Sequence, residues 1–556
     1  MKGATFLAAL AAMAGACCAA SAGESADVVV YGSTPGGISA AMQAKRMGLS
    51  AVIVSPESRI GGMTTGGLGQ TDVGDTEAHG GISRQFYRDI RSHYADKSKW
   101  VYGQGRDEYD WNGHVFPHDS DTMWMFEPSV ALSILERWER EEGLRIVRGA
   151  RLDRRPGGVE SEVGRIVSMR TEDGRVWRGR VFVDATYEGD LMAAAGVSYT
   201  VGREANSVYG ETLNGAQPNQ GYHKLAKGVD PYVVKGDPES GLLPGIDPAP
   251  MDAEGTGDRR VQAYNFRLCL TDVPENRIPF EKPAGYDERD YELFFRNYEA
   301  GEPAPPVPWI NSVLPNRKTD TNNRKGFSSD FIGRSYTWPE ASYEERERIL
   351  IEHRKYQKGL LWTMAYHPRT PKAIRDFVSQ WGLCRDEFTE SGGWPRQLYV
   401  REARRMVGEY VMTEMDCCRK REAPKPVALG AYKMDSHHVR RYIGDDGCVH
   451  NEGDVEVKGG DGPYGIAYGS IVPQKGECAN LLVPVCISAT HIAFGSIRME
   501  PVFFALGQAA GTAAALAINA GCAVQDVDYG RLRERLVADG QRLDPDKWRT
   551  PPEAKK

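Results

Sequence analysis

The chain has 556 residues, of which 41% are hydrophobic and 26% charged, and its formal net charge is −7. This length allows roughly two to four domains with large cores, and the composition is that of an ordinary globular protein. The acidic balance, spread without long charge runs, argues against a nucleic-acid-binding protein, which usually carries a basic face.

The first segment, residues 1–22, reads MKGATFLAALAAMAGACCAASA. One lysine precedes an apolar run and small residues follow it, which is the pattern of a secretory signal peptide. We therefore expect export to the periplasm or the medium. A lipoprotein anchored at Cys17 or Cys18 is less favoured, because no large aliphatic residue stands just before them. No other apolar run reaches about 18 residues, so we expect no transmembrane segment in the mature chain.

Residues 28–41 read VVVYGSTPGGISAA, and residues 51–55 form a second apolar run. This order predicts a strand, a glycine turn, a helix and a parallel strand, as in dinucleotide-binding folds. The free N–H groups at the start of such a helix suit a pyrophosphate. The candidate cofactor-binding residues are Gly32, Ser33, Thr34, Pro35, Gly36 and Gly37. A tight turn in an ordinary parallel sheet is the alternative.

Two positions depart from the usual dinucleotide-binding pattern. Thr34 replaces a glycine, and its hydroxyl is a candidate to bond a phosphate. Ser55 stands where an acidic residue normally binds the ribose, and Glu57 follows two residues later. Either side chain is therefore a candidate for the ribose contact.

A second glycine cluster, RIGGMTTGGLG, occupies residues 59–69. A nicotinamide-binding domain needs no such loop here, whereas flavoproteins of the glutathione-reductase type have an R-x-G-G segment along the flavin, where glycine lets the backbone approach. FAD is therefore the expected cofactor. The candidate residues are Arg59, Gly61, Gly62, Met63 and Thr64. A flexible surface loop is the alternative.

Residues 144–190 predict a strand, a hairpin with Asp173-Gly174 at its turn, and a buried strand that ends in the sequence DAT. Thr186 and Asp190 are expected near the phosphates of the cofactor. Asp184 is equally well explained as a loop cap.

The middle of the chain, residues 206–430, has a different composition. It is rich in Pro, Gly and aromatic residues up to about residue 340, and then shows helical apolar spacing from residue 344. We interpret it as an inserted substrate domain of mixed α+β structure, between two parts of an FAD-binding domain at 27–205 and 431–525. Residues 526–556 are expected to form a short helix and a tail.

Two motifs lie in this inserted segment. Asp320, Asn322 and Asn323 predict a polar loop at the domain cleft, where substrates usually bind, or a set of turns and caps. Residues 394–411, WPRQLYVREARRMVGEYV, are interpreted as a helix. Its Arg401, Arg404 and Arg405 would then pair with Glu402 and Glu409 in a mainly structural role.

Near the C-terminus, an apolar strand over residues 481–487 precedes an Ala- and Gly-rich helix opened by Pro501. Free N–H groups near Met499, Glu500 and Val502 are candidates to meet the C2 carbonyl of the flavin and stabilise the reduced ring. A well-packed core helix is the other interpretation, and the two are compatible.

Proton transfer near neutral pH is most simply done by histidine. The candidate catalytic residues are His491, between the last strand and the flavin-facing helix, and His437 or His438 in DSHHVRRY. Structural histidines are the alternative. Arg498 is a candidate to bind a substrate anion or to stabilise reduced flavin; its alternative is a salt bridge to Glu500 or another acid.

Eight of the ten cysteines follow the expected cleavage site. Export permits disulfides, but their spacing does not reveal the pairing. No C-x-x-C occurs, which argues against a redox-active dithiol or a clustered iron–sulfur site, and we expect no metal.

A resemblance to the large FAD-dependent oxidoreductase family of bacterial, often exported, proteins is carried by YGSTPGGISAA, RIGGMTTGGLG, VFVDATYEGD, NFRLCLT, LPNRKTDTNN, WPRQLYVREARRMVGEYV and SATHIAFGSIRMEPVFFALGQAAG. It covers nearly the whole chain after residue 26 and is distantly similar to fumarate-reductase-type flavoproteins. The resemblance implies an α/β fold, with a Rossmann-like parallel sheet plus a β-meander, and bound FAD. The resemblance does not indicate a substrate.

The sequence thus predicts an exported FAD-dependent oxidoreductase that transfers a hydride between a small polar substrate, hydroxyl-bearing or sugar-like, and flavin N5. A non-catalytic exported flavin-binding or accessory protein is the alternative. The electron acceptor, the mode of FAD attachment and the oligomeric state stay open. The n-region MKGATF has no arginine pair, so either FAD binds after passage of an unfolded chain, or the protein resides in the cytoplasm.

Overall fold

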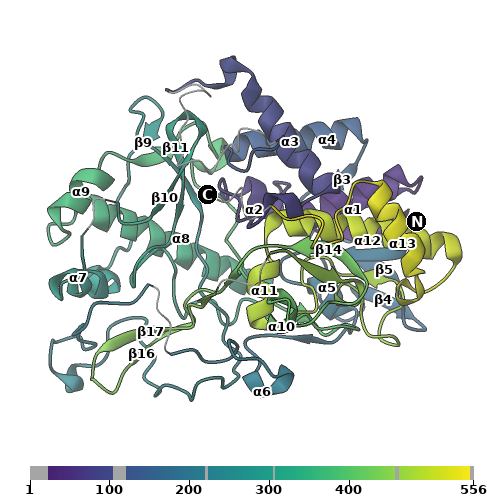
Figure 1. Cartoon of the computed structure of the whole chain (residues 1–556). Coiled ribbons are helices and arrows are strands. Elements are labelled where there is room, and N and C mark those ends of the chain that lie inside the picture. The colour runs from purple at the N-terminus through teal and green to yellow at the C-terminus, as the bar shows by residue number, and fades with distance from the viewer. Residues whose placement is uncertain (1–22, 104–120, 219–222, 305–306, 458–461, 551–556) are drawn as a thin grey trace, which may run out of the picture.

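The structure is a computed structural model, and it describes residues 23–103, 121–218, 223–304, 307–457 and 462–550. Two large sheets organise this part of the chain, one of seven strands and one of five. In Figure 1 the five-stranded sheet lies on the left with β10 and β11, and the seven-stranded sheet on the right with β4 and β5. The expected signal peptide, residues 1–22, lies outside the described residues.

The seven-stranded sheet has the order β3-β2-β1-β6-β5-β4, and β20 pairs with β6 off this path. The pairs β3–β2, β2–β1, β1–β6 and β6–β20 are parallel, whereas β4, β5 and β6 form an antiparallel meander. This arrangement confirms the expected parallel sheet with a meander. The bounds are β1 Glu24–Tyr31, β2 Ala51–Val54, β3 Arg145–Val147, β4 Val159–Glu162, β5 Arg165–Arg170, β6 Val176–Asp184 and β20 Leu481–Leu482.

Two strand predictions change in detail. The hairpin turn at Gly174, with φ 85°, joins β5 to β6 as expected, but the apolar run before DAT continues β6 instead of starting another strand. The strand expected over residues 481–487 is reduced to the two residues of β20. Pro484 lies just beyond it and has no N–H to donate to a ladder.

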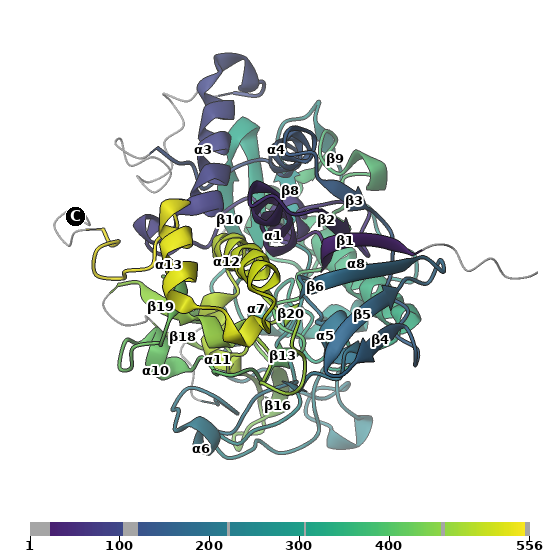
Figure 2. The same cartoon turned by 90° about the vertical axis from the view of Figure 1, so that its right-hand side faces the viewer.

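Helices α1, Pro35–Arg46, and α12, Glu500–Ala520, lie side by side against this sheet (Figure 2). Their approach requires small residues, because a Cβ on Gly507 would lie 2.1 Å from the carbonyl oxygen of Gly36. Among the described helices, α12 is long and apolar enough to cross a membrane, but 94% of its most apolar window is buried. It is a core helix of this molecule.

Further helices surround this sheet. They are α2 Gly62–Thr65, α3 Gly81–Ala95, α4 Pro128–Glu141, α5 Asp190–Ala194, α10 Glu414–Cys417, α11 His491–Ile497 and α13 Tyr529–Ala538. The last of these confirms the short helix expected after residue 526. A further one-turn helix, α6, spans Asn206–Tyr209.

The five-stranded sheet is antiparallel and has the order β10-β11-β8-β12-β9. Its bounds are β8 Leu268–Thr271, β9 Arg277–Ile278, β10 Ile310–Leu314, β11 Lys318–Asn322 and β12 Gly382–Cys384. The helices at this end are α7 Glu292–Glu299, α8 Tyr343–Tyr366 and α9 Lys372–Val378. Helix α8 confirms the predicted helical spacing. Asp320 and Asn322, expected in a loop, belong to strand β11.

The helix predicted over residues 394–411 is wrong. This segment has no regular secondary structure apart from the short strand β13, Arg405–Met406. Its arginines pair with distant acids: Arg401 with Asp330 at 2.9 Å, Arg404 with Asp190 at 2.8 Å and Arg405 with Glu204 at 2.7 Å. Arg405 also makes the predicted pair with Glu402, at 3.6 Å. Since all three side chains are buried, these tertiary ion pairs outweigh the local helical spacing.

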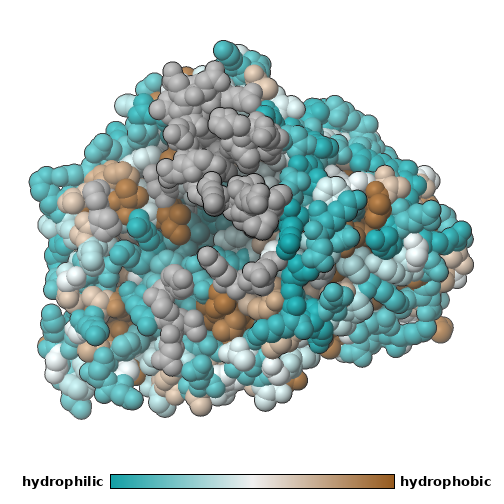
Figure 3. Space-filling model, in the orientation of Figure 1, coloured by the Kyte–Doolittle hydropathy of each residue, from teal (hydrophilic) through white to brown (hydrophobic). Residues whose placement is uncertain are grey.

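Short antiparallel pairs complete the described part of the chain. They are β7 Tyr199–Thr200 with β13, β14 Pro426–Gly430 with β19 Tyr464–Ala467, β15 Met434–Asp435 with β18 Glu456–Val457, and β16 Arg440–Ile443 with β17 Val449–Glu452. The face in Figure 3 is mainly hydrophilic, and its hydrophobic residues lie in separate small groups. The expected domain limits near residues 205, 430 and 525 stay predictions.

Candidate functional site

The first glycine turn opens a cavity at the start of α1, which we call the turn cavity. Its lining residues are Gly32, Ser33, Thr34, Pro56, Glu57, Arg59, Gly62, Thr186, Tyr187, Glu188 and Gln397. Gly32 has φ 102°, and a Cβ on Gly37 would lie 2.0 Å from the carbonyl oxygen of Gly32. Both glycines are therefore required by the close approach of turn and helix.

Thr34 has a structural task in this turn. Its hydroxyl accepts a hydrogen bond from the Gly37 N–H at 3.4 Å and donates one to the Ala185 carbonyl at 2.7 Å. A hydroxyl carries a single hydrogen, and the hydroxyl hydrogen of Thr34 is already engaged in the bond to the Ala185 carbonyl. The expectation that this hydroxyl bonds a phosphate is therefore not met in this arrangement, although Thr34 itself lines the turn cavity.

Ser55 and Glu57 differ in their positions. The Ser55 hydroxyl lies 2.7 Å from that of Ser33 and accepts a hydrogen bond from the Glu57 N–H at 3.2 Å. Glu57 lines the turn cavity and Ser55 does not. Of the two candidates for a ribose contact, Glu57 therefore presents its carboxylate to the cavity, while Ser55 holds the two turns together.

The second glycine turn is joined to the first, because the Gly61 N–H donates to the Ser33 carbonyl at 2.7 Å. Gly61 and Gly62 have φ 92° and 52°. A Cβ on Gly62 would lie 2.3 Å from the hydroxyl oxygen of Tyr187. The Met63 N–H donates to that same hydroxyl at 2.9 Å.

Tyr187 and Thr64 both donate to the carboxylate of Glu500, at 2.9 and 2.7 Å. Burial raises the pKa of Glu500 to about 7, although these hydrogen bonds oppose the shift. Glu500 begins α12, where the Val502 N–H already donates to the Met499 carbonyl at 2.9 Å. The second glycine turn, Tyr187 and the start of α12 thus form one hydrogen-bonded unit.

Asp184, Thr186 and Asp190 end the DAT strand. Asp184 accepts from the Thr186 hydroxyl and from the Met192 N–H, so it acts as the loop cap given as its alternative, and burial raises its pKa to about 6. Thr186 lines the turn cavity as expected. Asp190 does not line the turn cavity. Burial acts to raise the pKa of Asp190, but Arg346 and two further arginines hold that pKa well below its usual range.

Two further cavities continue from the turn cavity. The middle cavity is lined by Tyr187, Tyr399, Val400, Arg401, Glu402, Val485, Phe494, Arg498, Glu500 and Phe503. The polar cavity, of about 250 Å³, is lined by Gln70, Asp72, His223, Arg267, Ile310, Ser312, Asn322, Asn323, Tyr399, Tyr432, Lys433, Asp435, His437, Asp454, Glu456 and Arg498. Tyr187 is common to the first two cavities, and Tyr399 and Arg498 to the last two.

Arg498 stands at the junction of the middle and polar cavities. It donates to the Tyr399 hydroxyl at 2.7 Å and to the Asp435 carbonyl at 3.0 Å, and it lies 4.0 Å from the Asp435 carboxylate. The alternative considered for Arg498 was a salt bridge to Glu500 or to another acid, and the structure pairs it with another acid, Asp435. Arg267, held by Asp320 through two hydrogen bonds, adds a second guanidinium to the polar cavity.

Two acid–base groups in the polar cavity, Asp435 and His437, have pKa values shifted in opposite directions. Burial raises the pKa of Asp435 to about 7, and Arg498 opposes this shift. Burial and then Arg401 lower the pKa of His437 to about 3, so its imidazole is neutral at pH 7. Its Nδ1 lies 2.7 Å from Asp330 and must carry the hydrogen of that bond.

The other candidate histidines lie outside the lining of the polar cavity. His491 is 2% exposed, and its Nδ1 lies 2.8 Å from Glu402. His438 is buried, with Nε2 3.7 Å from Asp454. Of the four residues predicted to be catalytic, the fold therefore brings His437 and Arg498 to one cavity. A catalytic role for His491 or His438 stays a prediction.

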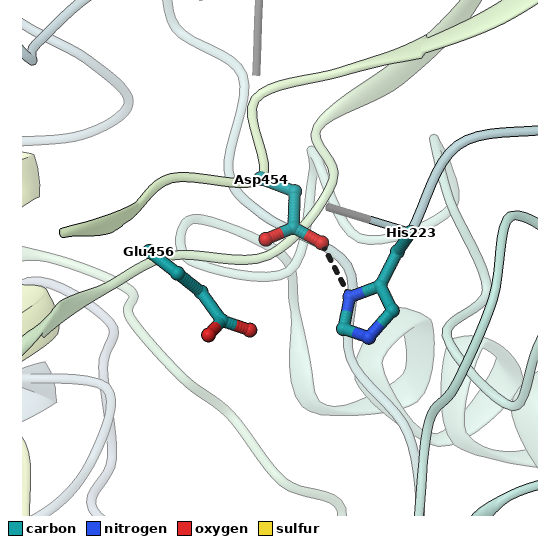
Figure 4. Close-up of side chains that lie close together, drawn as sticks. All are labelled: His223, Asp454 and Glu456. Atoms are coloured by element: carbon teal, nitrogen blue, oxygen red, sulfur yellow. Dashed lines mark hydrogen bonds and ion pairs between the residues drawn. The ribbon is translucent and has the colours of Figure 1, made fainter. Parts of the chain in front are cut away.

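Figure 4 shows His223, Asp454 and Glu456, which lie close together and belong to the lining of the polar cavity. Their ligand atoms lie within 4.8 Å of one another, and such donors can hold a divalent cation. His223 Nδ1 bonds Asp454 at 2.8 Å, and Lys433 contacts the Glu456 carboxylate. Lys433 supplies one positive charge beside the two carboxylates, and the expectation that the protein holds no metal stays a prediction.

Several polar atoms of the polar cavity residues are buried without a partner among the described residues. These are Asn323 Oδ1, Gln70 Oε1 and Arg498 Nε. Unpaired buried polar groups are costly and rare in folded proteins. Similar unpaired atoms occur elsewhere in the described residues, so these three do not by themselves mark a ligand site.

The residues that line the turn cavity match the polar groups of FAD, although the space between them is only about 30 Å³ in this structure. The start of α1 and the guanidinium of Arg59 offer donors to a pyrophosphate, and the Glu57 carboxylate offers an acceptor to ribose hydroxyls. The two glycine turns leave no space for side chains larger than hydrogen at Gly37 and Gly62. The same path then leads past Tyr187 toward Arg498, which suits an extended dinucleotide.

A family model described as FAD dependent oxidoreductase matches residues 27–536. The match spans nearly the whole chain, so the protein belongs to the FAD-dependent oxidoreductase family. It is an oxidoreductase, and FAD is its cofactor. No curated protein matches the chain.

Among solved structures, the chain is similar to a flavin-containing monooxygenase from Stenotrophomonas maltophilia, with 21% identity over 33% of this chain and 43% of that chain, and a TM-score of 0.19. It is also similar to a thioredoxin reductase from T. acidophilum, with 14% identity over 29% and 35% of the two chains and a TM-score of 0.16. The alignments span about two fifths of these structures or less, so they assign no activity to this chain.

Sequence reasoning missed three residues of the site. Asp435 was not among the predicted catalytic residues, because nothing in DSHH tells which of its groups is buried with a raised pKa. Tyr187 follows the DAT motif directly, and that position was a usable signal. Tyr399 lay in the segment wrongly interpreted as a helix.

Proposed function

We propose that this protein is an exported oxidoreductase that transfers a hydride between a small polar substrate, hydroxyl-bearing or sugar-like, and its FAD. The observation that carries the proposal is the series of three cavities. Tyr187 links the first to the second, and Arg498 with Tyr399 links the second to the third. A cofactor held at the glycine turns and a ligand in the polar cavity can thus approach each other at Arg498.

The polar cavity suits a small molecule with several hydroxyl groups. It offers both donors and acceptors, and three of its buried polar atoms lack partners. A cavity of about 250 Å³ limits the ligand to a small one. Arg498 and Arg267 orient oxygen atoms of the substrate, since a guanidinium offers several fixed donors.

Asp435 is the group we assign to proton transfer. A carboxyl with a pKa of about 7 is half ionised at neutral pH, which is the best compromise between being ionised and being a strong base. Its carboxylate takes the hydroxyl proton of the substrate, and Arg498, 4.0 Å away, stabilises its ionised form. FAD, when bound, supplies the acceptor for the hydride that leaves the adjacent carbon.

Anaerobic mixing of the FAD-loaded protein with sugars, polyols and hydroxy acids tests this function. A substrate should bleach the visible flavin absorbance. Arg498→Gln should keep FAD bound and lose the bleaching, whereas Arg155→Gln, at a side chain 81% exposed, should behave as wild type. FAD uptake without bleaching by any compound would favour the non-catalytic flavin-binding alternative.

Export rests on the sequence of residues 1–22. Expression of the full chain in a bacterium, followed by fractionation and N-terminal mass mapping, tests it. Mature protein that begins near residue 23 outside the cytoplasm supports export, and an intact N-terminus in the cytoplasm overturns it.

A further inference from the structure

Two cysteines that are distant in the sequence meet inside the five-stranded sheet. Cys269 lies in β8 and Cys384 ends β12, and their sulfur atoms are 3.7 Å apart. Both side chains are completely buried. The pairing register matches Leu270 with Leu383, so Cys269 and Cys384 are the next directly opposed pair of this antiparallel ladder.

The geometry points to a disulfide bond between Cys269 and Cys384, formed as the chain folds in an oxidising compartment. Directly opposed residues of antiparallel strands have Cα atoms about 4.5–5.5 Å apart. Disulfides span Cα separations of about 4.4–6.8 Å, so the two strands need no rearrangement. Only the side chains must turn to bring the sulfur atoms to bonding distance.

The other described cysteines make different contacts. The sulfur of Cys486 lies 3.2 Å from the Thr186 carbonyl, that of Cys478 lies 3.6 Å from Asn480 and that of Cys417 lies 3.9 Å from the Ala493 carbonyl. The sulfur of Cys448 lies 3.6 Å from the Asp446 carbonyl. Among the eight described cysteines, the pair in β8 and β12 is the one in which two sulfur atoms are found in contact, so it is the pair that the fold prepares for a covalent link.

The step itself is an ordinary thiol–disulfide exchange. The two thiols lose two protons and two electrons and form one S–S bond, while a disulfide oxidant, such as oxidised glutathione, is reduced to two thiols. Burial raises the pKa of both thiols, and the attacking species is the thiolate. Exchange is therefore slow in the folded protein and takes place before the sheet closes.

The bond would close a long loop of the chain. The two cysteines are 115 positions apart, and the enclosed segment contains β10, β11, α8 and α9. A cross-link over such a loop restricts the unfolded chain. It would also fix β8, which directly follows Arg267 of the polar cavity.

Refolding of the reduced chain with FAD in a glutathione redox buffer tests the inference independently of export. After alkylation in denaturant, peptide mapping should show Cys269 and Cys384 unmodified and joined, with a mass lower by two hydrogen atoms. Alkylation of both residues, or their linkage to other cysteines, would overturn it. Because the readout is a mass, it is separate from flavin bleaching.

Two variants provide matched controls. Cys384→Ser should leave Cys269 free for alkylation, whereas Cys478→Ser should keep the linked pair. Diamide added to the folded reduced protein should oxidise the pair far more slowly than refolding does; equally fast oxidation contradicts the burial argument.

In cells, full-length protein should carry the bond and a chain without residues 1–22 should lack it. A fully reduced pair in exported protein would overturn formation in the cell, whatever the flavin reactivity.

Discussion

Asp435 and His437 are neighbours in DSHH, yet the fold makes one a base at neutral pH and leaves the other neutral. Both are affected first by burial, which disfavours the charged form of each group. For a carboxyl this raises the pKa, to about 7, and for an imidazole it lowers the pKa, to about 3. The lowered pKa therefore does not favour His437 as a base near pH 7, and a catalytic role for His437 stays a prediction.

Asp435→Asn should reduce the rate of substrate-driven flavin reduction by about 10²–10⁴-fold, because the proton acceptor is lost. In the wild type, this rate should rise as pH passes about 7 and Asp435 ionises. The measurement is single-turnover reduction under anaerobic conditions between pH 5 and 9. Asp287→Asn, at a surface aspartate paired with Arg289, is the control and should keep the pH profile. An unchanged profile in Asp435→Asn would exclude the assignment.

Glu500 allows a second test at this scale, on stability. Its pKa is about 7 in the folded protein and near 4.5 in the unfolded chain, so between these values only the folded state holds the proton. Stability should therefore fall as pH rises from about 4.5 to about 7, by at most about 3 kcal/mol. Glu500→Gln should flatten this decline in denaturant unfolding of the FAD-free protein. Parallel curves for variant and wild type would show that Glu500 ionises normally.

At the scale of elements, the contact of α1 with α12 is set by glycines. Gly507→Ala would place a Cβ 2.1 Å from the Gly36 carbonyl oxygen, and both helices must shift to relieve it. We expect a loss of about 1–3 kcal/mol or more in the free energy of unfolding. Gly530→Ala, in the exposed part of α13, should be neutral or stabilising by up to about 1 kcal/mol. Equal stability of both variants would mean that α12 has room to move.

The elements also show what sequence patterns can predict. The apolar run and glycine turn of β1 and α1 were predicted correctly, because buried strands and positive-φ turns depend on local residue types. The structure of the segment 394–411 was not predicted correctly. Arg and Glu spaced by three or four residues mimic a helix, but Arg401 and Arg404 pair with acids from other parts of the chain.

At the scale of the whole molecule, Asp190 joins parts that are distant in sequence. Its carboxylate forms ion pairs with Arg346 of α8 at 2.6 Å, with Arg404 at 2.8 Å and with Arg154 at 3.0 Å. Asp190→Asn would leave three arginines without their acid, and Arg346 and Arg404 are buried. We expect a loss of about 3–5 kcal/mol in stability, measured by thermal or denaturant unfolding.

Asp287→Asn is the control for this prediction, since Asp287 pairs with Arg289 at the surface and its loss should cost about 0.5 kcal/mol or less. In the wild type, the contribution of Asp190 is present above pH about 4 and is lost as the pH falls further, because its pKa is lowered in the folded protein. A stable Asp190→Asn variant with unchanged acid sensitivity would contradict a structural role for this cluster.

The sequence by itself determined the cofactor and the sheet that holds it. Gly32, Gly37, Gly61 and Gly62 are needed where backbone segments or the side chains of Tyr187, Leu135 and Thr65 approach too closely for a further side chain, and that need is visible as a residue type. The tertiary structure alone decided which acid and which arginines face the substrate, and which cysteines meet. Burial, charge partners and strand register are relations between residues far apart in the chain, and a linear pattern carries no measure of them.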